Sequence, residues 1–159
     1  DFSLINSYFP SGTSGTERQD FKYEYLADFD LYIAELRQSE PNLIICGDVN
    51  ICHQEIDIHN PKGNKNSSGF LPEEREWVSQ FLDKGFTDCF RHFDPSPDNY
   101  TWWSYRAQDW ETSDRGRRLD HMWVTPDLKE KAKSHVVHKH VRGWGKPSDH
   151  APIVTEFAF

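Results

Sequence analysis

The stretch from Ile44 to Phe70, IICGDVNICHQEIDIHNPKGNKNSSGF, begins as an apolar run and continues as a long polar loop. The run at 43–46 is short and bounded by polar residues, which is typical of a strand that is covered on both faces. Asp48 and Asn50 follow it directly, and the period of two in a strand would point both side chains to one side. Because ligand sites in α/β sheets favour the carboxyl ends of strands, this pair is a candidate site.

Helices and strands are expected on both sides of this stretch. Residues 2–8 partly alternate as a strand does, and Thr16 with Gln19 predicts a capping box before a helix that runs to about Ser39. The expected apolar row of this helix is Phe21, Tyr25, Phe29, Tyr32 and Leu36.

The second half of the chain is expected to be richer in strands. A helix should begin at Pro72 and end near Gly85, with Trp77, Val78, Phe81 and Leu82 on its apolar side. Short strands are then predicted at 100–105, 119–125, 135–141 and 152–159, with a short helix at 126–132. This order predicts a layered α/β fold with a mixed sheet, and the length of 159 residues indicates that residues 1–159 form one domain or a piece of one.

Composition narrows the function classes. The chain has 159 residues, a net charge of −8 and three cysteines without a C-x-x-C pair, so neither a disulfide framework nor a zinc site is suggested. We therefore expect a reducing, cytoplasmic setting. No apolar run is long enough to span a bilayer, so a membrane role is set aside. The stretch 115–146 is locally basic despite the acidic total, and such a patch can attract a polyanion.

Two further motifs carry acids and an imidazole. P-S-D-H-A-P at 147–152 places Asp149 beside His150 just before the last strand, and R-L-D-H at 118–121 contains Asp120. His150 could act as a general base near neutral pH if another acid orients its ring, and Asp120 is the candidate for that acid. Each motif alone is ordinary, since Asp48 after a glycine is often a turn residue and Ser148-Asp149-His150 could be a helix or strand cap with a surface histidine.

Taken in order, the motifs resemble one family. N-S-Y-F-P-S-G, I-C-G-D-V-N, E-I-D-I-H-N-P-K-G-N, T-W-W-S-Y, G-R-R-L-D-H and P-S-D-H-A-P together resemble the exonuclease III family of apurinic/apyrimidinic (AP) endonucleases. G-D-x-N and S-D-H-x-P are shared by the wider superfamily of endonucleases, exonucleases and phosphatases. The N-P-K-G-N loop and R-L-D-H narrow the resemblance to the DNA-repair branch.

The resemblance implies a role for each matching residue. His150, held by Asp120, would orient or activate the attacking water or the phosphate, and Asp48 would manage a proton at the nucleophile or the leaving oxygen. Asn50 and Tyr8 would hydrogen-bond phosphate oxygens. Asp149, with Asp48 and Asn50, would lie at a Mg²⁺ or Mn²⁺ ion, a cation that takes oxygen ligands. The residues implied on the DNA side are Asn64, Lys65, Trp102 and Arg117.

From the residues alone, Trp102 and Trp103 are better explained as core than as a ligand platform, although neighbours in a strand face opposite sides. The chain also departs from the family twice on the DNA side. Ser67 stands where close members have a second asparagine after K-G-N, and Arg117 stands where some have a tryptophan.

The resemblance implies a DNase I-like, four-layer α/β sandwich, of which this chain matches about the carboxyl-terminal three-fifths. The amino-terminal part, with a metal-binding glutamate, has no counterpart here. We therefore expect a Mg²⁺-dependent AP endonuclease and 3′-to-5′ exonuclease on double-stranded DNA with abasic sites or damaged 3′ ends, while the fragment itself is weakly active or inactive. An uncovered sheet face should make the fragment self-associate.

Two alternatives remain open on the sequence. One is a relative that hydrolyses a phosphate ester other than DNA, such as an inositol phosphate. The other is a non-catalytic DNA-binding module that uses the basic stretch 115–146 and the tryptophans.

Overall fold

The structure, a computed structural model, describes residues 1–145 and 148–159. Its elements are β1 (Ser3–Asn6), α1 (Thr16–Leu36), β2 (Leu43–Asp48), η1 (Glu55–Asp57), α2 (Pro61–Asn64), α3 (Pro72–Asp83), β3 (Thr87–Asp88), α4 (Cys89–Phe93), β4 (Trp102–Trp103), α5 (Trp110–Ser113), β5 (Gly116–Arg117), β6 (Asp120–Val124), α6 (Pro126–Lys131), β7 (Ala132–Val137), η2 (Lys139–Gly143) and β8 (Ile153–Phe157).

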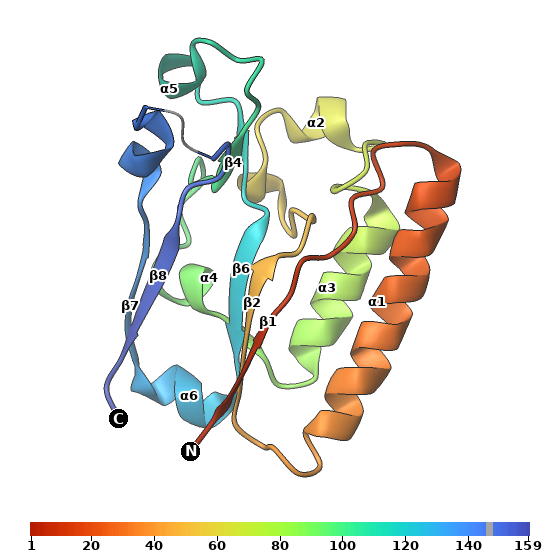
Figure 1. Cartoon of the computed structure of the whole chain (residues 1–159), viewed down its shortest axis with the longest axis vertical. Helices are drawn as coiled ribbons and strands as arrows, with labels where there is room; N and C mark the ends of the chain where they lie inside the picture. The colour runs from red at the N-terminus through yellow and green to blue at the C-terminus, as the bar shows by residue number, and fades with distance from the viewer. Residues whose placement is uncertain (146–147) are drawn as a thin grey trace.

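A mixed sheet forms the centre of the molecule, with strand order β1-β2-β6-β3. β1 and β2 are parallel, whereas β6 is antiparallel to both β2 and β3. Helices α1 and α3 cover one face, and the β7–β8 pair lies on the opposite side (Figure 1). The prediction of a layered α/β fold with a mixed sheet is confirmed.

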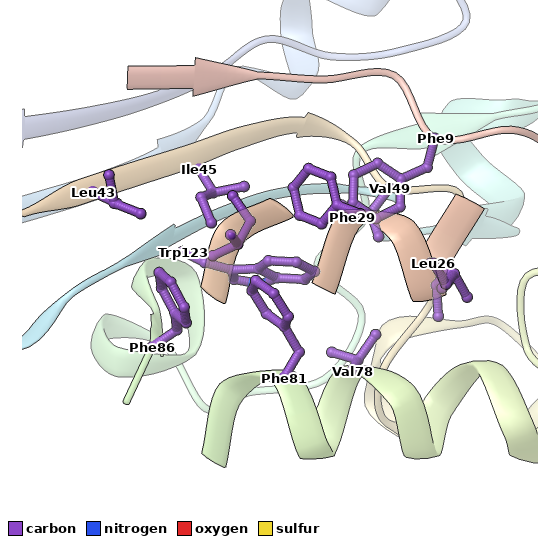
Figure 2. Close-up of a cluster of buried hydrophobic side chains, with 12 residues drawn as sticks. Phe9, Leu26, Phe29, Leu43, Ile45, Val49, Val78, Phe81, Phe86 and Trp123 are labelled. Atoms are coloured by element: carbon purple, nitrogen blue, oxygen red, sulfur yellow. The ribbon is translucent and has the colours of Figure 1, made fainter. Parts of the chain in front are cut away.

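The main core fills the space between the sheet and the two long helices. Ile45 of β2 and Trp123 of β6 meet Phe29 of α1 and Phe81 of α3 (Figure 2). All four are at most 7% exposed. Burying side chains of this size gains about 1.5–3 kcal/mol each, so this layer anchors β2 and β6, the strands that carry the candidate site residues.

Helix α1 buries the predicted face only in part, because Phe29 is buried and Tyr25 and Leu36 pack against the core, whereas the other two residues of the predicted row are exposed. Its buried residues are Lys22, Leu26, Phe29 and Ile33, whereas Phe21 and Tyr32 are 49% and 53% exposed. Lys22, which the predicted row does not contain, is fully buried against Glu74 of α3, with a Nζ–Oε1 distance of 2.7 Å. The predicted capping box is also wrong, since Gly15 is the N-cap and no side chain caps the helix.

The other helix and strand predictions differ mainly in length. α3 begins at Pro72 as predicted. The strand expected at 100–105 is reduced to the two residues of β4, and the one expected at 135–141 ends at Val137 and gives way to η2. Each strand ends where its partner strand ends. β4 pairs with the two-residue β5, and Val137 of β7 pairs with Ile153, the first residue of β8. Pro147, the first residue of the predicted P-S-D-H-A-P motif, lies outside the described residues.

A buried ion cluster connects the loop after β2 to the start of β6. Arg118 donates to both Asp57 and Asp88, and its side chain is 1% exposed. Arg91 adds a second guanidinium to Asp57. Burial alone would raise the pKa of both carboxyl groups, but the charge and hydrogen bonds of Arg118 outweigh it and hold the pKa of Asp57 and Asp88 far below the usual range. We refer to Asp57, Asp88, Arg91 and Arg118 as the buried ion cluster.

Candidate active site

Asp48 ends β2 opposite Asp120, the first residue of β6, because these two are register partners in the antiparallel pair. His150 lies between them. Its ring Nδ1 donates to Asp120 Oδ2 at 2.8 Å, and its Nε2 is 3.8 Å from Asp48 Oδ2. An acid thus orients the imidazole from one side while the other ring nitrogen faces a second acid.

Asp48 is held by its own neighbour. The Asn50 backbone N–H donates to Asp48 Oδ1 at 2.9 Å and the Asn50 side-chain amide donates to Oδ2 at 3.2 Å. Asn50 adopts a left-handed conformation with φ 54°, so its side chain reaches Asp48 through a tight turn and not through strand periodicity. The same amide donates to the Phe9 carbonyl at 2.8 Å, which ties the pair to the segment after β1.

Glycine is required near the end of β2, one residue before Asp48. Gly47 has φ +132°, and a Cβ built on it would lie 2.0 Å from the Ser7 carbonyl oxygen. The close approach of the chain after β1 therefore sets the residue type that precedes Asp48.

Electrostatics in the site are dominated by acids. Burial and the charge of Asp120 raise the pKa of Asp48 to about 6, against the hydrogen bond from Asn50 and the charge of His150. Burial disfavours the charged imidazole, but the hydrogen bond and charge of Asp120, with the charges of Asp48 and Asp149, outweigh it and raise the pKa of His150. The site holds a surplus of negative charge, which suits a cation or a proton.

A cleft of about 370 Å³ opens beside these residues. We refer to it as the site cleft; its lining consists of Tyr8, Ser11, Thr13, Asp48, Asn50, Ser68, Gly69, Trp102, Arg117, Leu119, Asp149 and His150. Asp120 lies behind His150 and contributes instead to a larger, more apolar cavity of about 640 Å³ on the other side of the pair. The cleft therefore gathers seven of the residues singled out in the sequence: Tyr8, Asp48, Asn50, Trp102, Arg117, Asp149 and His150.

One wall of the cleft comes from the polar loop and from β4–β5. Arg117 donates to Asn64 Oδ1 at 3.1 Å and to the Ser68 carbonyl at 3.3 Å, and its guanidinium carbon is 5.9 Å from the centre of the Trp102 ring. Trp102 in turn donates from Nε1 to Asp149 Oδ2 at 2.8 Å. Lys65 follows α2 as an exposed residue and is not among the described residues that line the cleft.

The oxygen donors in the cleft have the chemistry of a Mg²⁺ or Mn²⁺ site, but their number is small. Both oxygens of Asp48 and one oxygen of Asp149 already accept hydrogen bonds from protein donors. Within residues 1–145 and 148–159, no three histidine, cysteine or acidic side chains form a group that could hold a metal ion. The described part of the chain therefore offers an incomplete donor set.

Sequence reasoning missed Lys22, which supports the site from behind. Its buried Nζ donates to the Asn50 carbonyl at 2.8 Å while pairing with Glu74. Glu74 Oε2 also accepts from the amides of Gly69 and Leu71. No local signal separates Lys22 from the exposed lysines of a helix, because its partner lies on α3.

Known proteins resemble this chain along nearly all of its length. The model of the Endonuclease/Exonuclease/phosphatase family matches residues 4–150. An exodeoxyribonuclease of Bacillus subtilis is 42% identical, with 94% of this chain and 58% of the relative covered. A DNA-(apurinic or apyrimidinic site) endonuclease of Dictyostelium discoideum is also 42% identical, with 96% of this chain and 42% of the relative covered.

Solved structures agree with the fold. A 3′ phosphatase from Neisseria bound to a product DNA hairpin superimposes with a TM-score of 0.93 at 28% identity, covering 98% of this chain and 61% of that one. An AP endonuclease from Archaeoglobus fulgidus gives a TM-score of 0.90 at 29% identity, again covering 98% and 61%. The chain spans about half the length of the curated relatives it matches. The resemblance to exonuclease III and AP endonucleases is confirmed, and the chain belongs to the Endonuclease/Exonuclease/phosphatase family.

Proposed function

We propose that this chain carries part of the active site of a DNA-repair nuclease, an AP endonuclease and 3′-to-5′ exonuclease that hydrolyses phosphodiester bonds. The observation that carries the proposal is the Asp120–His150–Asp48 arrangement, with distances of 2.8 and 3.8 Å, at the edge of the site cleft. An imidazole oriented by one acid and facing another can hold or move a proton at a water molecule next to a phosphate.

Each residue of the site has a separate role in the proposed hydrolysis. Asp120 fixes Nδ1 of His150 so that Nε2 faces Asp48, where a water proton would be taken. Asp48, with its pKa raised to about 6, can hold or release a proton near neutral pH. Tyr8 is 69% exposed and offers its hydroxyl to a phosphate oxygen. Asn50 keeps Asp48 in place through two hydrogen bonds.

A Mg²⁺ or Mn²⁺ ion belongs to the proposal because the cleft holds more acids than cations. Asp48, Asn50 and Asp149 would provide its oxygen ligands on this chain, and a bound ion would neutralise charge on the phosphate. Since this donor set is incomplete, we expect the chain by itself to be weakly active or inactive.

Double-stranded DNA with abasic sites or damaged 3′ ends is the proposed substrate. The wall of the cleft formed by Arg117 and Trp102 supports it, together with Asn64, which accepts a hydrogen bond from Arg117, because a guanidinium and an aromatic ring suit a phosphate and a sugar or base. Lys65 is exposed next to this wall and would reach the DNA backbone. The cytoplasm stays the proposed compartment, supported by three free cysteines. In the described part of the chain no helix has the length and apolarity needed to cross a membrane.

The test uses a labelled duplex with one abasic analogue, with and without Mg²⁺. The chain is assayed alone and with a second polypeptide that supplies the amino-terminal half of a family domain. We expect Mg²⁺-dependent cleavage in the second case, reduced about 100-fold or more by His150→Ala. His92→Ala, which removes an exposed histidine on α4, is the matched control and should cleave normally.

Other outcomes would redirect the proposal. Preference for a soluble phosphoester in a competition assay would indicate a non-DNA phosphoesterase. Salt-dependent duplex binding without cleavage, by a folded chain under every condition, would favour a DNA-binding module.

We also propose that the chain on its own self-associates. Leu4, Trp144 and Phe159 are 60%, 63% and 72% exposed, and the apolar cavity of about 640 Å³ opens beside β2 and β8. Exposed apolar surface of this kind favours association. A sizing column should show dimers or larger species, and a monomer at high concentration would contradict this.

A further inference from the structure

Asp120 and His150 come from different parts of the fold, and one hydrogen bond between them is not enough to fix their geometry. Asp120 begins β6, whereas His150 precedes β8, which pairs with β7 in a separate sheet. Both side chains are partly exposed, with values of 17% and 28%. Another group must therefore hold the two backbones at a fixed separation.

The backbone of Thr101 lies between the two segments. Its N–H donates to the Arg117 carbonyl at 2.9 Å, and its carbonyl accepts from the amide of Ala151 at 2.7 Å. The next residue, Trp102, forms an isolated bridge with His150. Thr101 thus bonds to the strand that leads into β6 and to the residue directly after His150.

The side chain of Thr101 makes the connection to Asp120 itself. Thr101 Oγ1 accepts hydrogen bonds from the backbone amides of Leu119 and Asp120, both at 3.0 Å. Thr101 is fully buried, with 0% exposure. A buried amide without an acceptor is strongly disfavoured, so the hydroxyl fixes where the Asp120 backbone lies.

We propose that Thr101 is a positioning residue that sets the Asp120–His150 geometry of the active site. Its hydroxyl determines the placement of Asp120 and its carbonyl that of the segment carrying His150, so one residue aligns both partners. The catalytic consequence rests on the proposed nuclease function, whereas the effect on the geometry of the pair does not.

The chain contains a matched control at the other end of the same strand. Thr125 directly follows β6, is 1% exposed, and its Oγ1 accepts from the Leu43 amide at 3.0 Å. Thr125→Val therefore removes the same kind of buried hydrogen bond from the same sheet without touching Asp120 or His150. A comparison of the two valine variants separates positioning from general support of the fold.

The first arm measures geometry in the isotope-labelled chain by NMR. We expect the Nδ1 proton of His150, hydrogen-bonded to Asp120, to shift or lose its protection from exchange in Thr101→Val. It should be unchanged in Thr125→Val and close to wild type in Thr101→Ser, which keeps the hydroxyl.

The second arm measures duplex cleavage by the chain complemented with a family amino-terminal half. Thr101→Val should lower kcat at least about tenfold with KM within about twofold, because a displaced pair impairs the chemical step more than binding. Thr101→Ser should recover most of kcat, and Thr125→Val should cleave like wild type.

Each remaining outcome has a defined meaning. Equal losses in Thr101→Val and Thr125→Val, or an unchanged His150 proton in Thr101→Val, would overturn the proposal. If Thr101→Val does not fold, Thr101→Cys takes its place, since a thiol of similar size is a weaker acceptor and should give an intermediate loss of kcat. If the wild type does not cleave, the nuclease function fails, and the NMR arm alone decides the role of Thr101.

Discussion

Two clusters of charged side chains meet at the start of β6, separated only by Leu119. Arg118 belongs to the buried ion cluster, in which two guanidinium groups compensate two carboxylates. Asp120 belongs to the candidate-site group, in which Asp120 and Asp48 face the imidazole of His150 and a third carboxylate, Asp149, lines the same cleft. The first is balanced and buried, whereas the second is acidic and partly open. The comparison indicates that balanced charge here supports the fold, while unbalanced charge beside a cleft is left for a ligand.

The largest effect should come from breaking the balanced cluster. Arg118→Met leaves Asp57 and Asp88 buried with less positive charge, and we expect a loss of about 3–5 kcal/mol in the free energy of unfolding. Urea denaturation at pH 7 measures it. Arg115→Met, which removes an exposed arginine nearby, should change stability by less than about 0.5 kcal/mol. Similar values for both variants would show that the buried cluster does not stabilise the fold.

The same cluster predicts an acid dependence. Because the folded pKa of Asp57 and Asp88 lies below the unfolded value of about 3.9, their contribution is fully present above that pH and is lost as pH falls through the folded pKa. Wild type should lose stability steeply below about pH 4. In Arg118→Met the free energy of unfolding should fall less steeply with pH below about pH 4. If it falls as steeply as in wild type, the buried ion cluster is not the source of the acid dependence.

Removing the charge of Asp48 should raise the free energy of unfolding, and this gain should be smaller than the loss caused by Arg118→Met. The folded pKa of Asp48 is about 6, above an unfolded value of about 3.9, so its ionisation lowers stability as pH rises between these values. Asp48→Asn should lack that loss and be about 1–2 kcal/mol more stable than wild type at pH 7 in EDTA. Stability measured from pH 4 to 8 tests this, and a destabilised asparagine variant would contradict it.

The smallest effect should come from an exposed ion pair that belongs to neither cluster. Asp30 and Lys84 pair across α1 and the end of α3, with side chains 29% and 46% exposed. Asp30→Asn should change the free energy of unfolding by less than about 0.5 kcal/mol, because solvent screens such pairs. If Asp30→Asn lowered the free energy of unfolding as much as Arg118→Met, burial could not explain why the two ion pairs differ in their contribution to stability.

The part of the site that could be predicted from the sequence consists of residues that lie close together in short motifs. Asp48 and Asn50 share one turn, and Asp149 and His150 are neighbours, so the motifs that contain them can be read directly. The acid of R-L-D-H proved to be the partner of His150, as expected. For the fold, the layered architecture and the start of α3 followed from periodicity and from Pro72.

Long-range pairing of charged residues explains what sequence reasoning missed. The predicted buried face of α1 did not include Lys22, because its partner Glu74 lies on another helix. Arg118 looked like part of a basic patch, although its partners Asp57 and Asp88 bury it completely. Charged residues are rarely buried without partners, and these partners lie far away in the sequence.

The crowding around Gly47 shows why the G-D-x-N motif begins with glycine in this chain. Since a Cβ at this position would lie 2.0 Å from the Ser7 carbonyl, the glycine follows from the parallel packing of β1 and β2 and not from phosphate chemistry. In this motif the aspartate and asparagine belong to the proposed site, whereas the glycine is required by the chain segment that lies alongside β2. A distant relative that retained the acid and amide but carried alanine at this position would need a displaced first strand, so its Tyr8 counterpart would approach the cleft from a different direction.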